Sequence, residues 1–131
     1  MITGTNIPDN TVIPSGSAKT ISSLSIPPGI WIVSYYSNVY PDGGSVSTSN
    51  YQGLRYNLST TIDTFDFIAL SGSEGINYVN ATVLPTIHGI IPLTISSTTT
   101  YYLNVSITYT GPGTIRSNNV NISKFKATRI G

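Results

Sequence analysis

The chain has 131 residues, of which 39% are hydrophobic and only 8% are charged, with a formal net charge of +1 and no cysteine. This length predicts one domain that buries its own core. The scarcity of charge excludes the basic surface of a nucleic-acid-binding protein, and the lack of cysteine excludes disulfides, thiolate catalysis and thiolate metal ligands. Isoleucine, valine and threonine make up about a third of the residues, which predicts a mainly β structure.

Residues 1–14 are expected to form an extended arm or the end of a stalk, and residues 15–131 a head domain. Runs typical of strands recur between Gly, Pro, Asn and Asp turns, without a helical period. The expected strands cover residues 19–26, 30–40, 51–58, 61–70, 76–84, 87–95, 99–110 and 120–130, with a loop at 71–75 and turns at 27–29, 41–44 and 111–113. These predict an all-β, antiparallel β-sandwich, a jelly roll of about eight strands.

The strand over 30–40 has apolar side chains on both of its faces. Because side chains alternate along a strand, Trp31, Val33 and Tyr35 point to one side. Ile30, Ile32 and Tyr36 point to the other side. The outer face of a sandwich sheet normally meets water, so the second apolar face predicts a partner chain and an oligomer.

Other strands carry their own signals. The strand over 99–110 alternates cleanly, so we expect Asn104 and its polar neighbours to meet water while the apolar residues enter the core. Pro92 predicts an edge strand or a bulge. Lys124, Lys126 and Arg129 are expected to lie on a solvated edge strand that discourages pairing between sheets.

A short core motif carries a family resemblance. The pattern Gly29-x-Trp31-x-Val33-x-Tyr35 resembles the Gly-x-Tyr-x-Phe-x-aromatic signature of the C1q and tumour-necrosis-factor-like jelly rolls, with Trp for Tyr and Val for Phe. The ending Phe125–Gly131 is similar to the last strand of trimeric fibre-head domains of phages and large DNA viruses. The resemblance implies a homotrimer at the tip of a stalk that binds a cell-surface receptor or glycan. It implies that core and trimer-interface positions include Trp31, Val33, Tyr35 and Phe125.

Residues that could carry chemistry are few. His88 is the only histidine, and we interpret it as a polar residue beside a strand, because a metal site or a general base needs partners. Asp63 and Asp66 would point to opposite faces of a strand and so form no acid–base pair. A weak calcium site drawing on Asp42 or Glu74 is a minor alternative. No serine has an activating base in a recognisable motif, so we predict no enzyme, no metal and no cofactor.

Tyrosine is the remaining candidate for ligand binding, since its ring stacks on apolar sugar faces while its hydroxyl bonds to water or ligand. Tyr40, Tyr51 and Tyr56 are at or after the turn at Asp42, although tyrosines are also common in cross-strand packing. Glycosylation triplets start at Asn57, Asn80, Asn104 and Asn121, which is about the number that composition alone predicts.

The favoured function is a homotrimeric head of a viral or phage fibre, at the virion surface or outside the cell, that attaches to a host receptor or glycan. A monomeric carbohydrate-binding module is the alternative. Neither a membrane span nor a secretory signal at Met1–Thr5 is expected. A protein of this kind working outside cells would be released by lysis or by removal of an upstream segment.

Overall fold

The computed structural model describes residues 1–7, 11–42, 50–64, 71–79, 87–110, 114–118 and 124–131. Within these residues the protein is all β, with two antiparallel sheets and no helix. The strands are β1 (Ile2–Thr3), β2 (Thr5–Asn6), β3 (Val12–Ile13), β4 (Lys19–Ile26), β5 (Gly29–Asp42), β6 (Asn50–Ser59), β7 (Ser71–Val79), β8 (Ile87–Ile95), β9 (Thr99–Thr110), β10 (Thr114–Asn118) and β11 (Lys124–Arg129). The predicted all-β class is confirmed, and the bounds of β4, β8 and β9 agree with the predicted ones.

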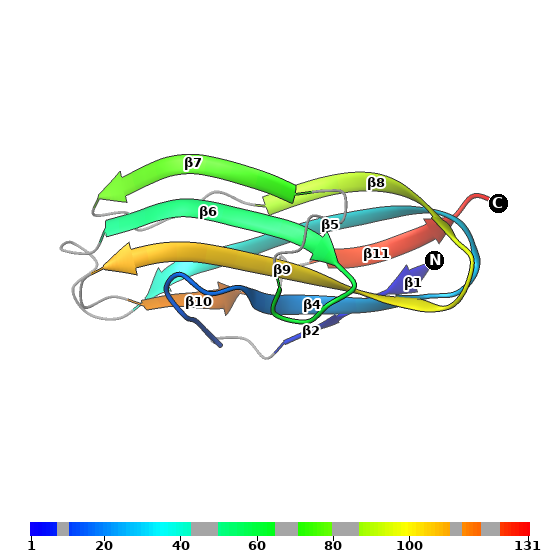
Figure 1. Cartoon of the computed structure of the whole chain (residues 1–131), viewed down its shortest axis with the longest axis horizontal. Coiled ribbons are helices and arrows are strands. Elements are labelled where there is room, and N and C mark those ends of the chain that lie inside the picture. Colours follow the sequence, from blue (N-terminus) through cyan, green and yellow to red (C-terminus); the bar gives the residue numbers. More distant parts are fainter. Residues whose placement is uncertain (8–10, 43–49, 65–70, 80–86, 111–113, 119–123) are drawn as a thin grey trace.

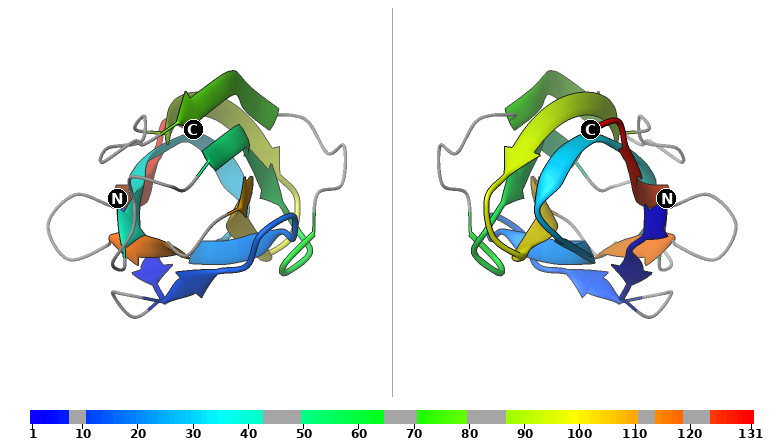
Figure 2. Two further views of the ribbon diagram at one scale, coloured as in Figure 1. Left: turned by 90° about the vertical axis from the view of Figure 1, so that its left-hand side faces the viewer. Right: turned by 90° about the vertical axis from the view of Figure 1, so that its right-hand side faces the viewer.

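The two sheets form the layers of an elongated sandwich (Figure 1). One sheet has the order β2-β4-β9-β6-β7. The other has the order β1-β11-β5-β10-β3, with β8 paired to the opposite side of β5. The end-on views show both sheets curving around a common interior (Figure 2), and both chain termini lie toward the same end of the long axis.

The long strand β5 organises its sheet and separates the two apolar faces as predicted. Trp31, Val33 and Tyr35 are buried, whereas Ile30 and Tyr36 are exposed. The strand begins at Gly29, whose φ of +146° favours glycine and whose Cβ position would lie 3.0 Å from the indole nitrogen of Trp31. That nitrogen donates a hydrogen bond to the Pro27 carbonyl over 3.0 Å, which ties the turn to the core.

The core lies between the sheets and takes apolar side chains from both. Its buried members are Ile13, Ile21, Leu24, Ile26, Trp31, Val33, Tyr35, Leu54, Leu58, Ile91, Ile95, Leu103, Val105, Ile107, Phe125 and Ala127. Leu103, Val105 and Ile107 of β9 alternate with polar residues, as the period of two predicts. Phe125 of β11, expected in the core, is fully buried there.

Three predicted boundaries are wrong. The expected turn at 41–44 does not start at residue 41, because Pro41 and Asp42 are the end of β5 and pair with Ile115 and Thr114 of β10. The expected loop at 71–75 is the first half of β7, because residues 71–74 pair with β6 from Asn57 to Leu54, and tertiary pairing overrides a polar, glycine-rich composition. Residues 61–64 form a turn and not the start of a strand, with Asp63 at φ +50°. The parts of the expected strands over residues 65–70, which include Asp66, 80–84 and 120–123 lie outside the described residues.

Edge positions gave one correct and one wrong prediction. Within the described chain β8 pairs only with β5, so Pro92 lies on an edge strand as expected. β11, however, lies between β5 and β1 and is no edge strand. Its basic residues therefore do not guard an open edge. Lys126 is instead exposed on the face of the sheet beside Ser34.

The first fourteen residues are extended where the structure describes them, and they join the sheets. β1 pairs with β11, β2 pairs with β4, and β3 pairs with β10. Ile13 is fully buried in the core. The described part of this segment therefore packs with the sandwich and does not stand apart from it.

Candidate functional site

Exposed apolar side chains lie on the outer face of the sheet around β5, which we call the β5 face. It consists of Ile30, Ile32, Ser34 and Tyr36 with those residues in register on β8 and β11 whose side chains are described, which are His88, Ile90, Pro92, Thr94, Lys126 and Thr128. Ile30 is 44% exposed, Tyr36 45% and Ile90 76%, while Ile32 is half-buried. Large apolar side chains thus gather on a surface that a single chain leaves in water.

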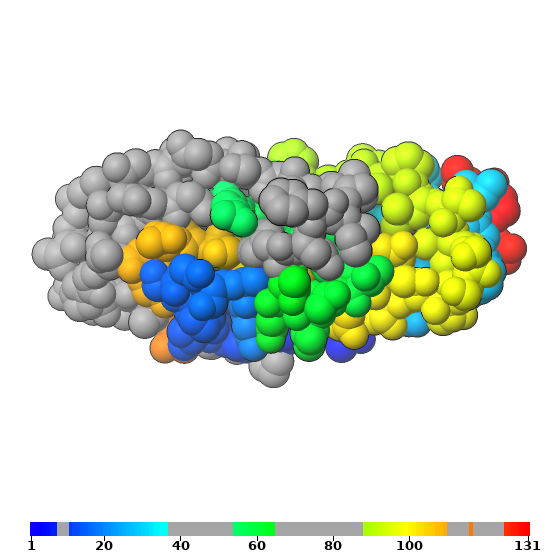
Figure 3. All heavy atoms as spheres, viewed as in Figure 1, coloured from blue at the N-terminus to red at the C-terminus, as the bar shows by residue number. Residues whose placement is uncertain are grey.

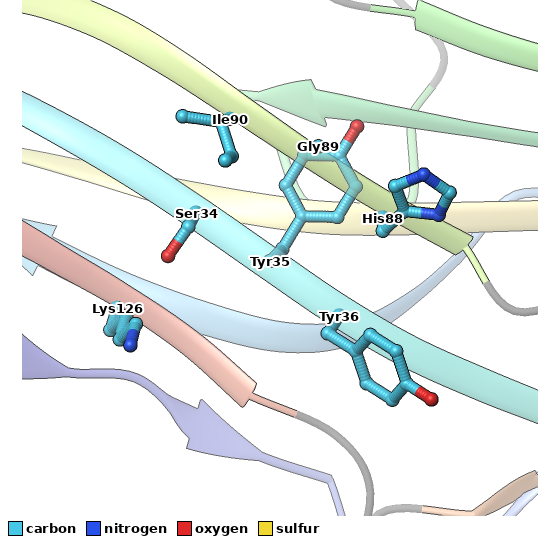
Figure 4. A pocket seen from close by; sticks show the side chains of 7 residues that line it. All are labelled: Ser34, Tyr35, Tyr36, His88, Gly89, Ile90 and Lys126. Atoms are coloured by element: carbon cyan, nitrogen blue, oxygen red, sulfur yellow. The ribbon is translucent and has the colours of Figure 1, made fainter.

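A shallow pocket of about 290 Å³ lies on the β5 face (Figure 4). It is lined by Ser34, Tyr35, Tyr36, His88, Gly89, Ile90 and Lys126. An aromatic ring, an imidazole, a hydroxyl and an ammonium group therefore surround one hollow, and none of its lining residues is acidic. Such a set can pack against apolar or aromatic groups and donate hydrogen bonds, which is binding chemistry.

Gly89 and Tyr35 form the support beneath this pocket. They are in register across β8 and β5, and a Cβ at residue 89 would lie 2.5 Å from the phenol oxygen of Tyr35. The Tyr35 ring thus covers the glycine and meets the Tyr56 ring edge-on, with centroids 6.0 Å apart. Burial, and to a smaller extent the neighbouring Tyr56 phenol, raises the pKa of Tyr35 to about 12.

The tyrosines predicted to bind ligand are not gathered into one described site. Tyr56 is half-buried and packs against the hydrophobic core, which is a structural position. Tyr40 is in register with Arg116, and Tyr51 with Tyr78 and Tyr109, but the side chains of Tyr40 and Tyr51 lie outside the described part of the structure. Sequence reasoning missed that Ile90 and Lys126 line the same pocket as Tyr36, because no local pattern reports the register between strands.

A polar cluster fastens the turn at 61–64, which follows β6, to β4 and β9 of the same sheet. The Thr20 hydroxyl donates to the Asn104 side-chain oxygen over 2.6 Å and accepts from the Asp63 amide over 2.9 Å. The Thr20 amide donates to the Asp63 carboxylate over 2.7 Å. The Asn104 amide donates to the carbonyls of Thr61 and Thr64 over 3.1 and 2.8 Å. Figure 3 shows this region (green) lying across the surface next to β4 (blue) and β9 (yellow).

This cluster corrects the prediction that Asn104 meets water, since its side chain is fully buried under the turn. Burial also removes two of the four glycosylation triplets from consideration. Asn57 and Asn104 are both 0% exposed, and a glycan cannot be attached to an enclosed amide in the folded chain. Asn80 and Asn121 lie outside the described residues.

In the described ranges, no three histidine, aspartate or glutamate residues lie close enough together to hold a metal ion. His88 is exposed on β8 and its register partner is Tyr36. The described residues also contain no helix long and apolar enough to span a membrane. Asp42 is the last residue of β5, and the side chains of Asp42 and Glu74 lie outside the described part of the structure.

The β5 face and its pocket are therefore the candidate site, formed by three strands that are far apart in sequence. Comparison with protein-family models gives no match for this chain, and a search of curated proteins finds no significantly similar sequence.

Proposed function

We propose that the chain is a jelly-roll head. In chain order, the antiparallel pair β5–β10 encloses the pair β6–β9. The pair β4–β9 belongs to one sheet and the pair β5–β8 to the other. Nested antiparallel pairing across eight strands is typical of the jelly roll. The eight longer strands β4–β11 match the number that this fold requires.

The head forms a homotrimer through the β5 face. The observation that carries this proposal is the exposure of Ile30, Tyr36 and Ile90 on one sheet surface. Burying apolar area contributes about 25 cal/mol per Å², so a second copy that covers this face stabilises the assembly. The low charge of the chain, 8% of residues, leaves little repulsion between copies. The threefold number follows from the resemblance of the β5 motif to trimeric jelly rolls.

The trimer serves as the head of a viral or phage fibre that attaches to a host receptor or glycan at the virion surface. Both termini lie toward one end of the sandwich (Figure 1), so a stalk joined there would leave the opposite end facing outward. A surface rich in hydroxyl and amide groups suits neutral glycans. Three copies on one stalk would also raise the apparent affinity of a weak site by multivalency.

Sedimentation equilibrium tests the assembly. We expect a mass of three times the 14.0 kDa chain at micromolar concentration. Ile90→Asn should give a folded monomer, because it puts an amide on the β5 face. Ile62→Asn is the matched control, since Ile62 is also exposed, at 57%, but lies in the turn on the other sheet, and it should remain trimeric.

A wild-type chain that stays monomeric would overturn the trimer. If that monomer bound neutral glycans on an array, the alternative of a carbohydrate-binding module would replace the fibre head. Attachment itself is tested by binding to host cells or glycans, where Ile90→Asn should lose most of the apparent affinity while Ile62→Asn keeps it.

A further inference from the structure

The single histidine of the chain lies on the β5 face. His88 is exposed, is in register with Tyr36, and lines the same pocket as Lys126. Figure 4 shows its imidazole on the strand β8 and the Tyr36 ring on the adjacent strand β5. Histidine is the side chain that changes charge between about pH 5 and 8. This face therefore contains the one group of the chain suited to sense mild acidification.

The charged groups around His88 are mostly of one sign. Lys126 lines the pocket, Lys124 is in register with Tyr36, and Arg116 is in register with Tyr40 further along β5. Tyr36 contributes a neutral phenol. Residues 80–86, which precede β8, and residues 119–123, which precede β11, contain no ionisable side chain.

The acidic residues of the described chain, Asp42, Asp63 and Glu74, are distant from His88 or belong to the other sheet, whereas Asp9 and Asp66 lie outside the described residues. Asp42 lies six residues beyond Tyr36 on β5, which is about 20 Å along a strand and more than twice the Debye length in physiological salt. Glu74 is on β7, in register with Leu54 of the second sheet. Within the described chain, therefore, no carboxylate is in register with His88 to stabilise an imidazolium.

We propose that protonation of His88 weakens the association of copies through the β5 face, so that the head is a trimer at neutral pH and dissociates in mild acid. This inference rests on the trimer proposed above. An imidazolium that lines the same pocket as Lys126 adds like charge to this face, and covering it with a second copy removes its hydration. The effect is repeated once in each copy of the assembly.

Sedimentation equilibrium at pH 8.0 and pH 5.0, with far-UV circular dichroism at both, measures this switch. We expect the concentration at half-association to rise about tenfold or more in acid for the wild-type chain. His88→Gln keeps a polar side chain of similar reach without the titrating group, and it should associate equally at both pH values. Lys126→Gln removes a cation from the same face and should reduce the ratio between the association constants at pH 8.0 and pH 5.0, whatever its effect on association at pH 8.0.

The outcomes separate the two proposals. A chain that is monomeric at both pH values overturns the trimer and this inference together. A trimer equally tight at pH 8.0 and pH 5.0, or tighter at pH 5.0, overturns only the role of His88. An acid response that persists in His88→Gln also overturns it, because no other histidine exists to produce it.

Discussion

At the scale of single residues, neighbours on opposite strands decide what each side chain can do. Tyr35 and Tyr36 are adjacent in sequence, yet the first packs into the core over Gly89 and the second is 45% exposed on the β5 face. The glycine has no functional group, but its lack of a Cβ is what allows the Tyr35 ring to lie there. The candidate pocket therefore has a floor because a glycine and an aromatic ring are paired in register.

The first prediction concerns the ionisation of Tyr35. Its pKa rises from 10.0 to about 12 on folding, so the folded state favours the neutral phenol. The resulting stabilisation is fully present below pH 10 and is lost as the pH rises toward 12. Tyr35→Phe should flatten this part of the stability–pH curve, measured by guanidinium unfolding between pH 8 and 12, and remove one late-ionising group from the absorbance titration near 295 nm. A variant with the wild-type titration would contradict the assignment.

At the scale of elements, short connections determine which strand surfaces are buried. The turn at 61–64 covers part of β4 and β9, and its hydrogen bonds with Thr20 and Asn104 satisfy polar groups that would otherwise be enclosed without partners. An alternating strand such as β9 has a buried polar position because this turn folds back over it. The same turn places Ile62 on the surface away from the β5 face.

The second prediction follows from that turn. Asn104→Ala removes two donated hydrogen bonds and leaves the Thr61 and Thr64 carbonyls without their amide partner. We expect a loss of about 2–4 kcal/mol in the free energy of unfolding, measured by chemical denaturation. Ser106→Ala, on the same side of β9 but only partly buried, is the control and should change it by less than about 1 kcal/mol. Equal effects of the two substitutions would show that the turn does not depend on Asn104.

At the scale of the whole molecule, the two outer surfaces differ. The sheet containing β4 and β9 has polar groups that its own turn covers, whereas the β5 face has apolar groups that nothing in the described chain covers. A sandwich with one polar and one apolar outer surface is expected to associate through the apolar one. We infer assembly from this asymmetry, and the proposed fibre-head function requires it.

Assembly predicts a stability that depends on protein concentration. If folded chains associate and unfolded chains do not, the midpoint of thermal unfolding should rise with concentration. Calorimetry between 5 and 500 µM should show this rise, of a few degrees for roughly each 1–2 kcal/mol gained, for the wild-type chain and for Ile62→Asn. Ile90→Asn should have a constant midpoint. A constant midpoint in all three proteins would exclude association in this range.

The sequence alone determined the class of fold, the bounds of β4, β8 and β9, and the division of β5 into two apolar faces, because the alternation of side chains is a property of any strand. It did not predict that residues 71–75 are a strand, that β11 is internal, or that Asn104 is buried. Those features depend on pairings such as Asn57 with Ser71 and on a turn brought over β9.

The candidate pocket is also a feature that depends on strand pairing and that the sequence alone did not predict. His88, Tyr36 and Lys126 are distant in sequence and become neighbours only through the register of β8, β5 and β11. Local composition does not encode this register, because it is set by the packing of all strands around one core. The sequence thus identified the apolar face, and the tertiary structure decided which polar groups share it.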